Sequence, residues 1–346
     1  MKQIKRIGMD TSKHIFQLHG VDAAEEVVLR KRLGRQQMVA FFAKLSPTVI
    51  GMEACGASHH WARVLEQLGH EVKLIAPQHV KPYVMRNKND GRDAEAVCEA
   101  MSRPRMRFVA VKTAEQQAAL MLTGLREQMV ARRTQLSNTI RGYAAEFGIM
   151  AARGLDKIEP LLAQIAQNES VPTMARDLFA MQGREYAQLQ IELKAIEAKL
   201  KAWHCTNADS RRLSKIPGVG LIGATALVMK TPDPRAFPSG RHFAAWLGLT
   251  PKDHSTAGKI RLGKITRAGD ERLRNVLVAG ATAVIQQARR GRGHPSPWVV
   301  ALLKRKPPKL AAVALANKIA RIAWKLLATG ESYDSARMFA ASPSAA

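Results

Sequence analysis

The stretch IGMDTSK at residues 7–13 closes a short apolar run with the carboxylate of Asp10. A second stretch, VIGMEACG at residues 49–56, repeats the arrangement with Glu53. Both runs have the length and apolar content of buried strands. A carboxylate at the end of a buried strand needs a partner, because an unpaired charge is costly to remove from water. The two stretches therefore predict a sheet edge at which carboxylates bind a divalent metal ion.

The first 110 residues alternate between strand and helix patterns. We expect strands at Ile4–Met9, Ile15–Val21, Val27–Leu29, Thr48–Met52 and Val72–Ile75, and helices at Arg35–Leu45, Ala57–Leu68 and Gly91–Met101, with a short irregular stretch at Pro77–Met85. The resulting order, βββαβαβα, is that of an RNase H-like domain. The first and fourth strands lie side by side in such a sheet. Asp10 and Glu53 are therefore expected close together.

Two further carboxylates, Asp90 and Asp93, occur in NKNDGRDA at residues 87–94, where the last helix begins. Residues three apart share a helical face, so both are expected to approach Asp10 and Glu53 from above the sheet. Four crowded carboxylates would repel one another unless one or two Mg²⁺ (or Mn²⁺) ions lay between them. Such a site suits phosphodiester cleavage. The alternative interpretation is that Asp90 caps the helix and Asp93 is an ordinary solvated residue.

Net charge predicts a nucleic-acid partner. The chain has 54 Lys and Arg against 28 Asp and Glu, a net charge of +26. Residues 211–330 alone hold 23 basic and 4 acidic side chains, whereas residues 111–210 hold 12 and 11. A field of this size recruits polyanions. No stretch reaches the roughly 20 apolar residues of a membrane span. We therefore expect a cytoplasmic protein without a membrane partner, associated with the nucleoid when it acts.

The three cysteines, Cys55, Cys98 and Cys205, are odd in number, widely spaced and without a CxxC pair. This pattern favours neither a disulfide framework nor a zinc site. We expect all three to be buried, reduced thiols.

The middle segment, residues 111–208, is predicted to be a helical coiled coil. Apolar residues recur at three- and four-residue steps in two rows, the first at Leu122, Leu125, Met129, Leu136, Tyr143 and Phe147 and the second at Leu189, Leu193, Ile196, Leu200 and Trp203. Two long amphipathic helices follow from these rows. Their seam-like spacing suits an antiparallel hairpin or a self-association stalk, so we expect an oligomerisation or spacing element.

The third segment, residues 209–330, opens with the pattern of a helix-hairpin-helix. LSKIPGVGLIGATALV at residues 213–228 places Gly218 and Gly220 where backbone amides can point at a phosphate from the start of the next helix. Such a contact would not read base sequence. The same turn can equally serve as a packing hairpin.

A strongly basic loop follows between Lys252 and Arg267, before a helix that starts near Asp270. It contains a single serine, Ser255, with Thr256 beside it. A loop serine is normally a hydrogen-bonding turn residue. Here the surrounding cations suit a phosphate and the charge that builds when a hydroxyl attacks it. The candidate nucleic-acid contacts of this segment are Gly218, Gly220, Lys252, Lys259, Arg261, Lys264, Arg267 and Arg272.

Together with the IPGVG turn and FAAWLGLTPKDHSTAGKIRLGKITRAGDERLR at residues 243–274, the carboxylate stretches closely resemble the DEDD-type insertion-sequence transposases related to the Piv DNA invertase. The resemblance covers nearly the whole chain. It implies a RuvC-like domain at 1–110, a coiled coil at 111–208, a mainly helical transposase domain at 209–330 and a flexible tail at 331–346. It further implies recombinases guided by a bridge RNA that pairs with donor and target DNA.

Residue by residue, the resemblance assigns the metal-binding DEDD set to Asp10, Glu53, Asp90 and Asp93 and the nucleophile to Ser255, with Thr256 as a weaker alternative. These five are then the catalytic residues. The serine would form a covalent phosphoserine that conserves the bond energy for rejoining. The resemblance also implies a homodimer that assembles into a tetramer, so that the composite site forms within one chain or across two.

Two other functions remain open from the residues themselves. A RuvC-like nuclease or junction resolvase would use the same carboxylates but attack with water, and it would not need Ser255. A non-catalytic nucleic-acid scaffold would carry a degenerate metal site, which the intact set of four carboxylates argues against.

Overall fold

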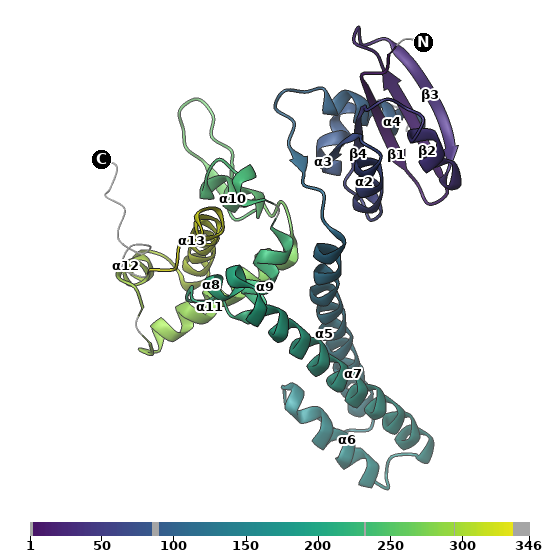
Figure 1. The fold of residues 1–346 in the computed structure, drawn as a ribbon. Coiled ribbons are helices and arrows are strands. Elements are labelled where there is room, and N and C mark those ends of the chain that lie inside the picture. The colour runs from purple at the N-terminus through teal and green to yellow at the C-terminus, as the bar shows by residue number, and fades with distance from the viewer. Residues whose placement is uncertain (1–2, 85–89, 232, 294, 335–346) are drawn as a thin grey trace. The chain divides into compact units, whose positions relative to one another are not determined.

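The computed structural model describes residues 3–84, 90–231, 233–293 and 295–334. The chain forms two compact units, Met1–Ala118 and Ala119–Ala346 (Figure 1). A mixed sheet organises the first unit, and helices make up most of the second. The predicted combination of an α/β part and an α part is confirmed at this level. Within the predicted tail, residues 335–346 lie outside the described residues.

The sheet of the N-terminal unit has the strand order β3-β2-β1-β4-β5-β6. Its strands are β1 (Arg6–Thr11), β2 (Ile15–Val21), β3 (Val27–Gly34), β4 (Val49–Glu53), β5 (Glu71–Ile75) and β6 (Phe108–Val109). β1 pairs with β4 in parallel, as β4 does with β5, and the other neighbours are antiparallel. The predicted adjacency of the first and fourth strands is confirmed, with Met9 opposite Met52.

Helical segments connect these strands in the predicted βββαβαβα order. They are η1 (Arg35–Gln37), α1 (Met38–Phe42), α2 (Ser58–Gln67), α3 (Pro77–Val80), η2 (Lys81–Tyr83) and α4 (Asp90–Met101). β1 starts two residues later than predicted and continues to Thr11, so Asp10 lies inside the strand. The short β6 was not predicted, because two residues carry no periodic signal.

Different helices cover the two faces of the sheet. On one face Ile7, Met9, Ile50 and Met52 are fully buried in a core with residues of α1 and α2. On the other face α4 lies directly on β1 and β4. The close approach depends on Gly8 and Gly51, which sit opposite each other in the two strands and share this face.

The missing side chain of Gly8 is what admits α4. A Cβ on Gly8 would lie 2.1 Å from the carbonyl oxygen of Ala94 and 2.4 Å from the backbone nitrogen of Cys98. A Cβ on Gly51 would meet the sulfur of Met101 at 2.7 Å. These distances are well inside van der Waals contact, so the helix backbone occupies the space that a larger residue would need.

The C-terminal unit is mainly helical. It holds α5 (Ala114–Glu146), which begins just before the unit boundary, then η3 (Leu155–Lys157), α6 (Ile158–Gln167), α7 (Thr173–Thr206), α8 (Ala208–Leu213), α9 (Leu221–Lys230), η4 (Pro234–Ala236), α10 (Gly240–Trp246), the strands β7 (Pro251–Asp253) and β8 (Leu262–Ile265), and then α11 (Glu271–Arg289), α12 (Pro297–Arg305) and α13 (Pro308–Thr329). Within the described residues, no helix has both the length and the hydropathy that crossing a membrane requires.

The two long predicted helices are present as α5 and α7, which lie alongside each other (Figure 1). An ion pair joins Arg126 Nη2 to Glu197 Oε1 at 2.8 Å, and a second joins Arg132 to Glu185 at 3.4 Å. The predicted apolar row of α7 is buried from Leu189 to Leu200.

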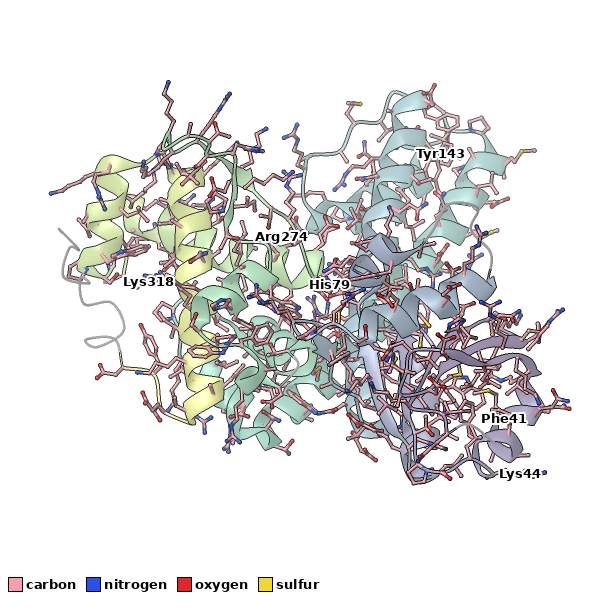
Figure 2. The ribbon with its side chains drawn as sticks, turned by 90° about the horizontal axis from the view of Figure 1, so that it is seen from above. Phe41, Lys44, His79, Tyr143, Arg274 and Lys318 are labelled. Carbon is pink, nitrogen blue, oxygen red and sulfur yellow. The ribbon has the colours of Figure 1, made fainter. Side chains whose placement is uncertain are left out.

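The apolar row predicted for α5 is wrong at Leu125, which is 37% exposed, and at its C-terminal end. Tyr143 of α5 is 56% exposed and is labelled in Figure 2. Phe147, which follows the end of α5, is 38% exposed. The buried residues of α5 are instead the smaller Thr123, Ser137, Ile140 and Ala144. Because α6 packs at this end and its core includes Ile140 and Ala144, the helix turns a narrower, smaller face inward than the sequence pattern suggests.

The C-terminal helices enclose the largest apolar core of the described chain around α11 and α13. Lys318 lies within this helical part and is only 9% exposed (Figure 2). Its ammonium stands 4.5 Å from the centre of the Trp298 ring, a cation–π contact, and burial lowers its pKa.

The prediction that all three cysteines are buried is wrong for two of them. Cys98 is buried beneath Gly8, and burial raises the pKa of its thiol. Cys55 and Cys205 are exposed. Cys55 follows the end of β4, and Cys205 lies in the last turn of α7, so both occupy element ends where the core no longer covers side chains.

Candidate functional site

Asp10 and Glu53 lie at the same end of two neighbouring parallel strands. Each comes one residue after the last paired position of β1 and β4. Immediately beyond them, Thr11 Oγ1 is 3.3 Å from Cys55 Sγ. The two segments that follow the carboxylates therefore remain side by side. Asp10 and Glu53 are half-buried. The structure therefore brings together the two strand-end carboxylates that the sequence predicted as neighbours.

Both carboxylates point to the face of the sheet that α4 covers. Alternate residues of a strand share a face, so Asp10 lies on the face of Gly8 and Glu53 on the face of Gly51. These are the two glycines against which α4 packs. The fold thus directs the two acids toward the helix that carries the other two.

The direction of α4 decides which of its residues come near Asp10. The side chain of Arg6 donates from Nε to the carbonyl oxygen of Cys98 at 3.1 Å, whereas Gly8 lies under Ala94 and Cys98. Moving forward along β1 therefore means moving backward along α4. The next residue of β1 on this face is Asp10, and the next turn back along α4 is its first turn.

That first turn carries the remaining two predicted acids. Asp93 is half-buried and lies four residues before Val97, on the same side of the helix. A Cβ on Gly51 would meet Val97 at 3.1 Å, so this side of α4 faces β4, the strand of Glu53. The backbone of Asp90 belongs to the same turn, while its side chain is outside the described part of the structure.

These acids have the donor chemistry of a hard divalent cation. Asp10, Glu53 and Asp93 offer only carboxylate oxygens, the ligand type that Mg²⁺ and Mn²⁺ prefer. Among the described side chains, no three His, Cys, Asp or Glu groups already stand close enough to form a metal site. Asp10, Glu53 and Asp93 each have an interaction partner in the structure. The residue types and their shared edge fit a metal that a fourth ligand, Asp90, would complete.

Ser255 lies in a small two-stranded hairpin formed by β7 and β8. The sequence predicted a loop here. Short strands form instead, because Thr266 N donates to Thr250 O at 2.8 Å and His254 N donates to Arg261 O at 2.9 Å. Every residue from Pro251 to Lys264 is exposed. The predicted nucleophile thus projects from a solvated element.

Two hydrogen bonds fix the position of Ser255 within the hairpin. Its Oγ accepts from the backbone N–H of Arg261 at 3.0 Å, and its own backbone N–H donates to Asp253 Oδ1 at 2.8 Å. The side chain and the backbone N–H of Ser255 both lower the pKa of the Asp253 carboxyl below its usual value. Asp253 is therefore ionised at neutral pH, and its carboxylate lies beside Ser255.

The base of the hairpin is fastened by a buried arginine that the sequence did not single out. Arg274 of α11 is 6% exposed and donates to the carbonyl oxygens of Leu247 at 3.1 Å and Ala268 at 2.7 Å (Figure 2). These two carbonyls flank the hairpin in sequence. The sequence signal for this role was the position of Arg274 within the apolar row of its helix. An arginine in such a row is buried and must find buried acceptors.

Two protein-family models match the chain. One, described as "Transposase IS116/IS110/IS902 family", matches residues 210–294, and one described as "Transposase" matches residues 7–147. The chain is 64% identical over 334 residues to the "Putative transposase y4pF/y4sB" of Sinorhizobium fredii, which covers 96% of this chain and 86% of that protein. This chain belongs to the IS116/IS110/IS902 transposase family.

Further relatives of this transposase extend over almost the whole chain. The "Probable family 20 transposase" of Pseudomonas aeruginosa is 45% identical over 95% of this chain and 98% of that protein. The "Transposase for insertion sequence element IS1111A" of Coxiella burnetii is 40% identical over 96% of this chain and 92% of that protein. The two family matches divide the candidate site, with all four carboxylates in one and Ser255 in the other.

The predicted basic contacts of the transposase fall into two groups. Those on and beside the hairpin are exposed, at Lys252, Lys259, Arg261, Lys264 and Arg267. Arg272 differs, because it forms an ion pair with Glu127, which also pairs with Lys230 at 3.4 Å. Lys230 in turn reaches Asp270, the N-cap of α11, at 3.2 Å. Arg272 thus takes part in a network that joins α5 to α9 and α11.

The glycines of the predicted helix-hairpin-helix have different positions. Gly218 has a left-handed backbone, with φ of 87°, and a Cβ there would lie 3.0 Å from the carbonyl oxygen of Gly280 in α11. Gly218 therefore serves close packing. Gly220 precedes α9 as its N-cap, is exposed and has open space where a Cβ would stand. The start of α9 at Gly220 is the part of this turn that a phosphate can approach.

Proposed function

We propose that this transposase cuts and rejoins DNA through a phosphoserine at Ser255, assisted by a metal site at Asp10, Glu53, Asp90 and Asp93. The observation that carries the proposal is the hydrogen-bonded Ser255 hydroxyl on an exposed, basic hairpin. The convergence of Asp10, Glu53 and the first turn of α4 at one sheet edge supports the metal half. The strand order of this sheet is also that of the RNase H-like fold we assign to it.

The carboxylates are assigned as ligands of Mg²⁺ or Mn²⁺. When bound, such an ion polarises the scissile phosphate and stabilises the charge on the leaving oxygen. The protein's own contribution is to hold the ligands in place. Gly8 and Gly51 do so by letting α4 pack so closely that its first turn reaches the end of β1.

The serine half carries out the bond exchange. Ser255 Oγ forms a bond to the phosphorus, one P–O bond to a flanking sugar breaks, and the released sugar oxygen takes up a proton from water. The proton of the serine hydroxyl leaves through Asp253, the carboxylate that accepts from the backbone N–H of Ser255. In the reverse step the hydroxyl of another DNA end attacks the phosphoserine and frees Ser255. The number of phosphodiester bonds is conserved, so no external energy source is needed.

The partners that we assign to this reaction are DNA and a guide RNA. The exposed cations Lys252, Lys259, Arg261, Lys264 and Arg267 suit the phosphates of donor and target DNA. The resemblance of the sequence to bridge-RNA-guided recombinases leads us to assign a guide RNA as the element that selects the site. Base pairing then reads sequence, which agrees with a surface whose cations suit backbone rather than bases.

We further propose that the active form is a homodimer that assembles into a tetramer, with α5 and α7 as the association element. Exposed apolar residues on these helices, among them Met121, Tyr143, Met181 and Ile191, support a self-association role. Mixing Asp10→Ala chains with Ser255→Ala chains tests whether the two halves come from different protomers. Recovered activity supports assembly across chains, and its absence when each homomer is inactive contradicts it.

The decisive experiment traps the covalent intermediate. A suicide DNA substrate carrying the element's end is incubated with the protein, guide RNA and Mg²⁺, and the protein–DNA adduct is measured. We expect an adduct for the parent chain, none for Ser255→Ala, and an adduct for Thr256→Ala, the matched control one residue away. Cleavage without an adduct would instead support a water-using RuvC-like nuclease. Loss of the adduct in Thr256→Ala alone would contradict the assignment of the nucleophile.

A further inference from the structure

A cavity of about 530 Å³ lies in the N-terminal unit, on the face of the sheet that carries Asp10. It opens between α4 and the two strands β2 and β3. Its lining is polar and mostly basic, with Gln17, His19, Arg30, Lys31, Arg32, Arg92 and Glu95 among the residues. Among the described residues, those that line it include none of the Ser255 hairpin and none of the cations predicted by sequence.

The pairing of the strands places two of these arginines in rows with the candidate metal edge. Asp10 is opposite Gln17 in β2, and Gln17 is opposite Arg32 in β3. Directly paired residues share a face of the sheet, so Arg32 lies on the face of Asp10. Two strand spacings separate them, which is about 10 Å. Arg30 occupies the next row, opposite His19 and in line with Gly8.

These arginines have no structural role that would explain their position. Arg30 and Arg32 are exposed, and within the described residues neither forms an ion pair or a hydrogen bond through its side chain. Lys31, between them, points to the opposite face and places its ammonium 4.9 Å from the centre of the Phe41 ring. The alternation therefore sends the two guanidinium groups to the side of Asp10 and the intervening cation away from it.

The local field around the cavity is positive. Burial lowers the pKa of His19, and the charges of Arg30 and Arg6 lower it further, against an opposing effect of Glu95. Glu95 is the carboxylate of the cavity lining, which also holds Arg30, Arg32 and Arg92. Planar guanidinium groups match the paired oxygens of a phosphate, and they hold it without reading base sequence.

We propose that Arg30 and Arg32 bind a backbone phosphate of the DNA strand that is cut, near the scissile phosphate at Asp10. The cavity, which we call the groove, then guides that strand across β3 and β2 toward the carboxylates. This inference rests on the proposed function, because it takes Asp10 as the place of cleavage. We assign DNA as the ligand, because the proposed function places the scissile phosphate in a DNA strand. Binding of RNA instead is one outcome of the test.

The experiment measures binding of the full-length protein to a short fluorescein-labelled DNA strand, by anisotropy over a range of salt concentrations. Arg32→Gln and Arg30→Gln each remove one charge from the groove. Lys44→Gln is the matched control, because it removes one exposed charge of the same unit just after α1, which packs on the other face (Figure 2). The loss of one phosphate contact reduces the slope of log K against log salt by about 0.7 for a single strand.

We expect this reduced slope for each arginine variant and an unchanged slope for Lys44→Gln. Equal slopes for all three variants would overturn the proposal. A reduction seen with an RNA strand of the same length but not with DNA would overturn the choice of DNA. Melting curves of the variants should match the parent, because both arginines are exposed.

The adduct assay separates this inference from the proposed function. If the parent chain forms the Ser255 adduct and the salt slopes do not differ, the groove assignment fails and the function stands. If the slopes differ and no adduct forms, the groove stands as a DNA-binding site and the serine mechanism fails. A neutral methylphosphonate that weakens adduct formation by the parent, but not by Arg32→Gln, would locate the contacted phosphate.

Discussion

The two halves of the candidate site are built in opposite ways. Asp10 and Glu53 sit on adjacent strands whose preceding residues, Met9 and Met52, are fully buried. Ser255 sits on a hairpin in which every residue from Pro251 to Lys264 is exposed. The carboxylates are therefore positioned by the same packing that stabilises the fold, whereas the serine is positioned by a few local hydrogen bonds. Changes that disturb the packing of the first half should destabilise the fold strongly, whereas changes in the second half should affect chemistry with little loss of stability.

The largest effect on stability is expected from Gly8→Ala. The added Cβ would lie 2.1 Å from a backbone oxygen of α4, so the helix must move off the sheet. We expect a loss of about 4 kcal/mol in the free energy of unfolding of this unit. Gly258→Ala in the hairpin is the matched control, with φ of 77° and open space around the new atom. It should cost only about 1 kcal/mol.

The measurement is the hydrogen-exchange rate of the sheet unit and of the hairpin, compared between Gly8→Ala and Gly258→Ala. Faster exchange in β1, β4 and α4 of Gly8→Ala is the expected result. Similar losses for Gly8→Ala and Gly258→Ala would break the distinction between a packed half and an exposed half.

A smaller effect, on rate alone, is expected from Asp253→Asn. The carboxylate accepts from the backbone N–H of Ser255, and an amide can keep that bond but accepts no proton. We expect adduct formation to slow by about 10²-fold, the usual size of a general-base contribution. Asp253→Glu should recover part of the rate, and the melting temperature should not change.

A shift of the pH–rate profile identifies the cause. Loss of a base with a low pKa removes the decline in rate toward acidic pH, which a purely structural change would leave in place. An unchanged rate for Asp253→Asn would show that the proton leaves by another route.

The smallest effect is expected from Glu25→Gln in the sheet unit. The hydrogen bond from Arg6 lowers the pKa of Glu25 from its usual 4.5 to about 2. A carboxylate with a lowered pKa stabilises the fold above pH 4.5, and this stabilisation disappears as the pH falls toward 2. Because Glu25 is half-exposed, we expect only about 1 kcal/mol.

The measurement is thermal melting of both chains between pH 7 and pH 2. The difference between parent and Glu25→Gln should be largest near neutral pH and vanish at the acidic end. Asp253 also has a lowered pKa, but in the exposed hairpin. Asp253→Asn should therefore change the pH dependence of stability in the same direction as Glu25→Gln but by less, and a change as large as that of Glu25→Gln would contradict the comparison.

Predictions from the sequence succeeded where a local period marks an element. The alternation of apolar runs and helical patterns gave the βββαβαβα order, and the row from Leu189 to Leu200 gave the buried side of α7. They failed where burial depends on distant partners. Tyr143 and Phe147 fit the apolar row of α5 but are exposed, since the neighbouring helices contact smaller residues.

The hairpin around Ser255 shows a second kind of limit. A run rich in Gly, Lys and Arg indicates a loop, and the strands β7 and β8 are too short to produce a periodic signal. Arg274 was missed for a related reason, because only the fold brings the carbonyls of Leu247 and Ala268 to its guanidinium.

The sequence by itself determined the residue types and their local setting. It placed Asp10 and Glu53 at the ends of apolar strands, and Ser255 in a basic stretch, because side-chain period and composition are local properties. Only the tertiary structure decided what faces what. The parallel pairing of β1 with β4 and the contact of α4 with Gly8 depend on residues far apart in the chain, and so does the row that leads from Asp10 to Arg32. Register between distant strands is set by packing of the whole core, and no short stretch of sequence contains it.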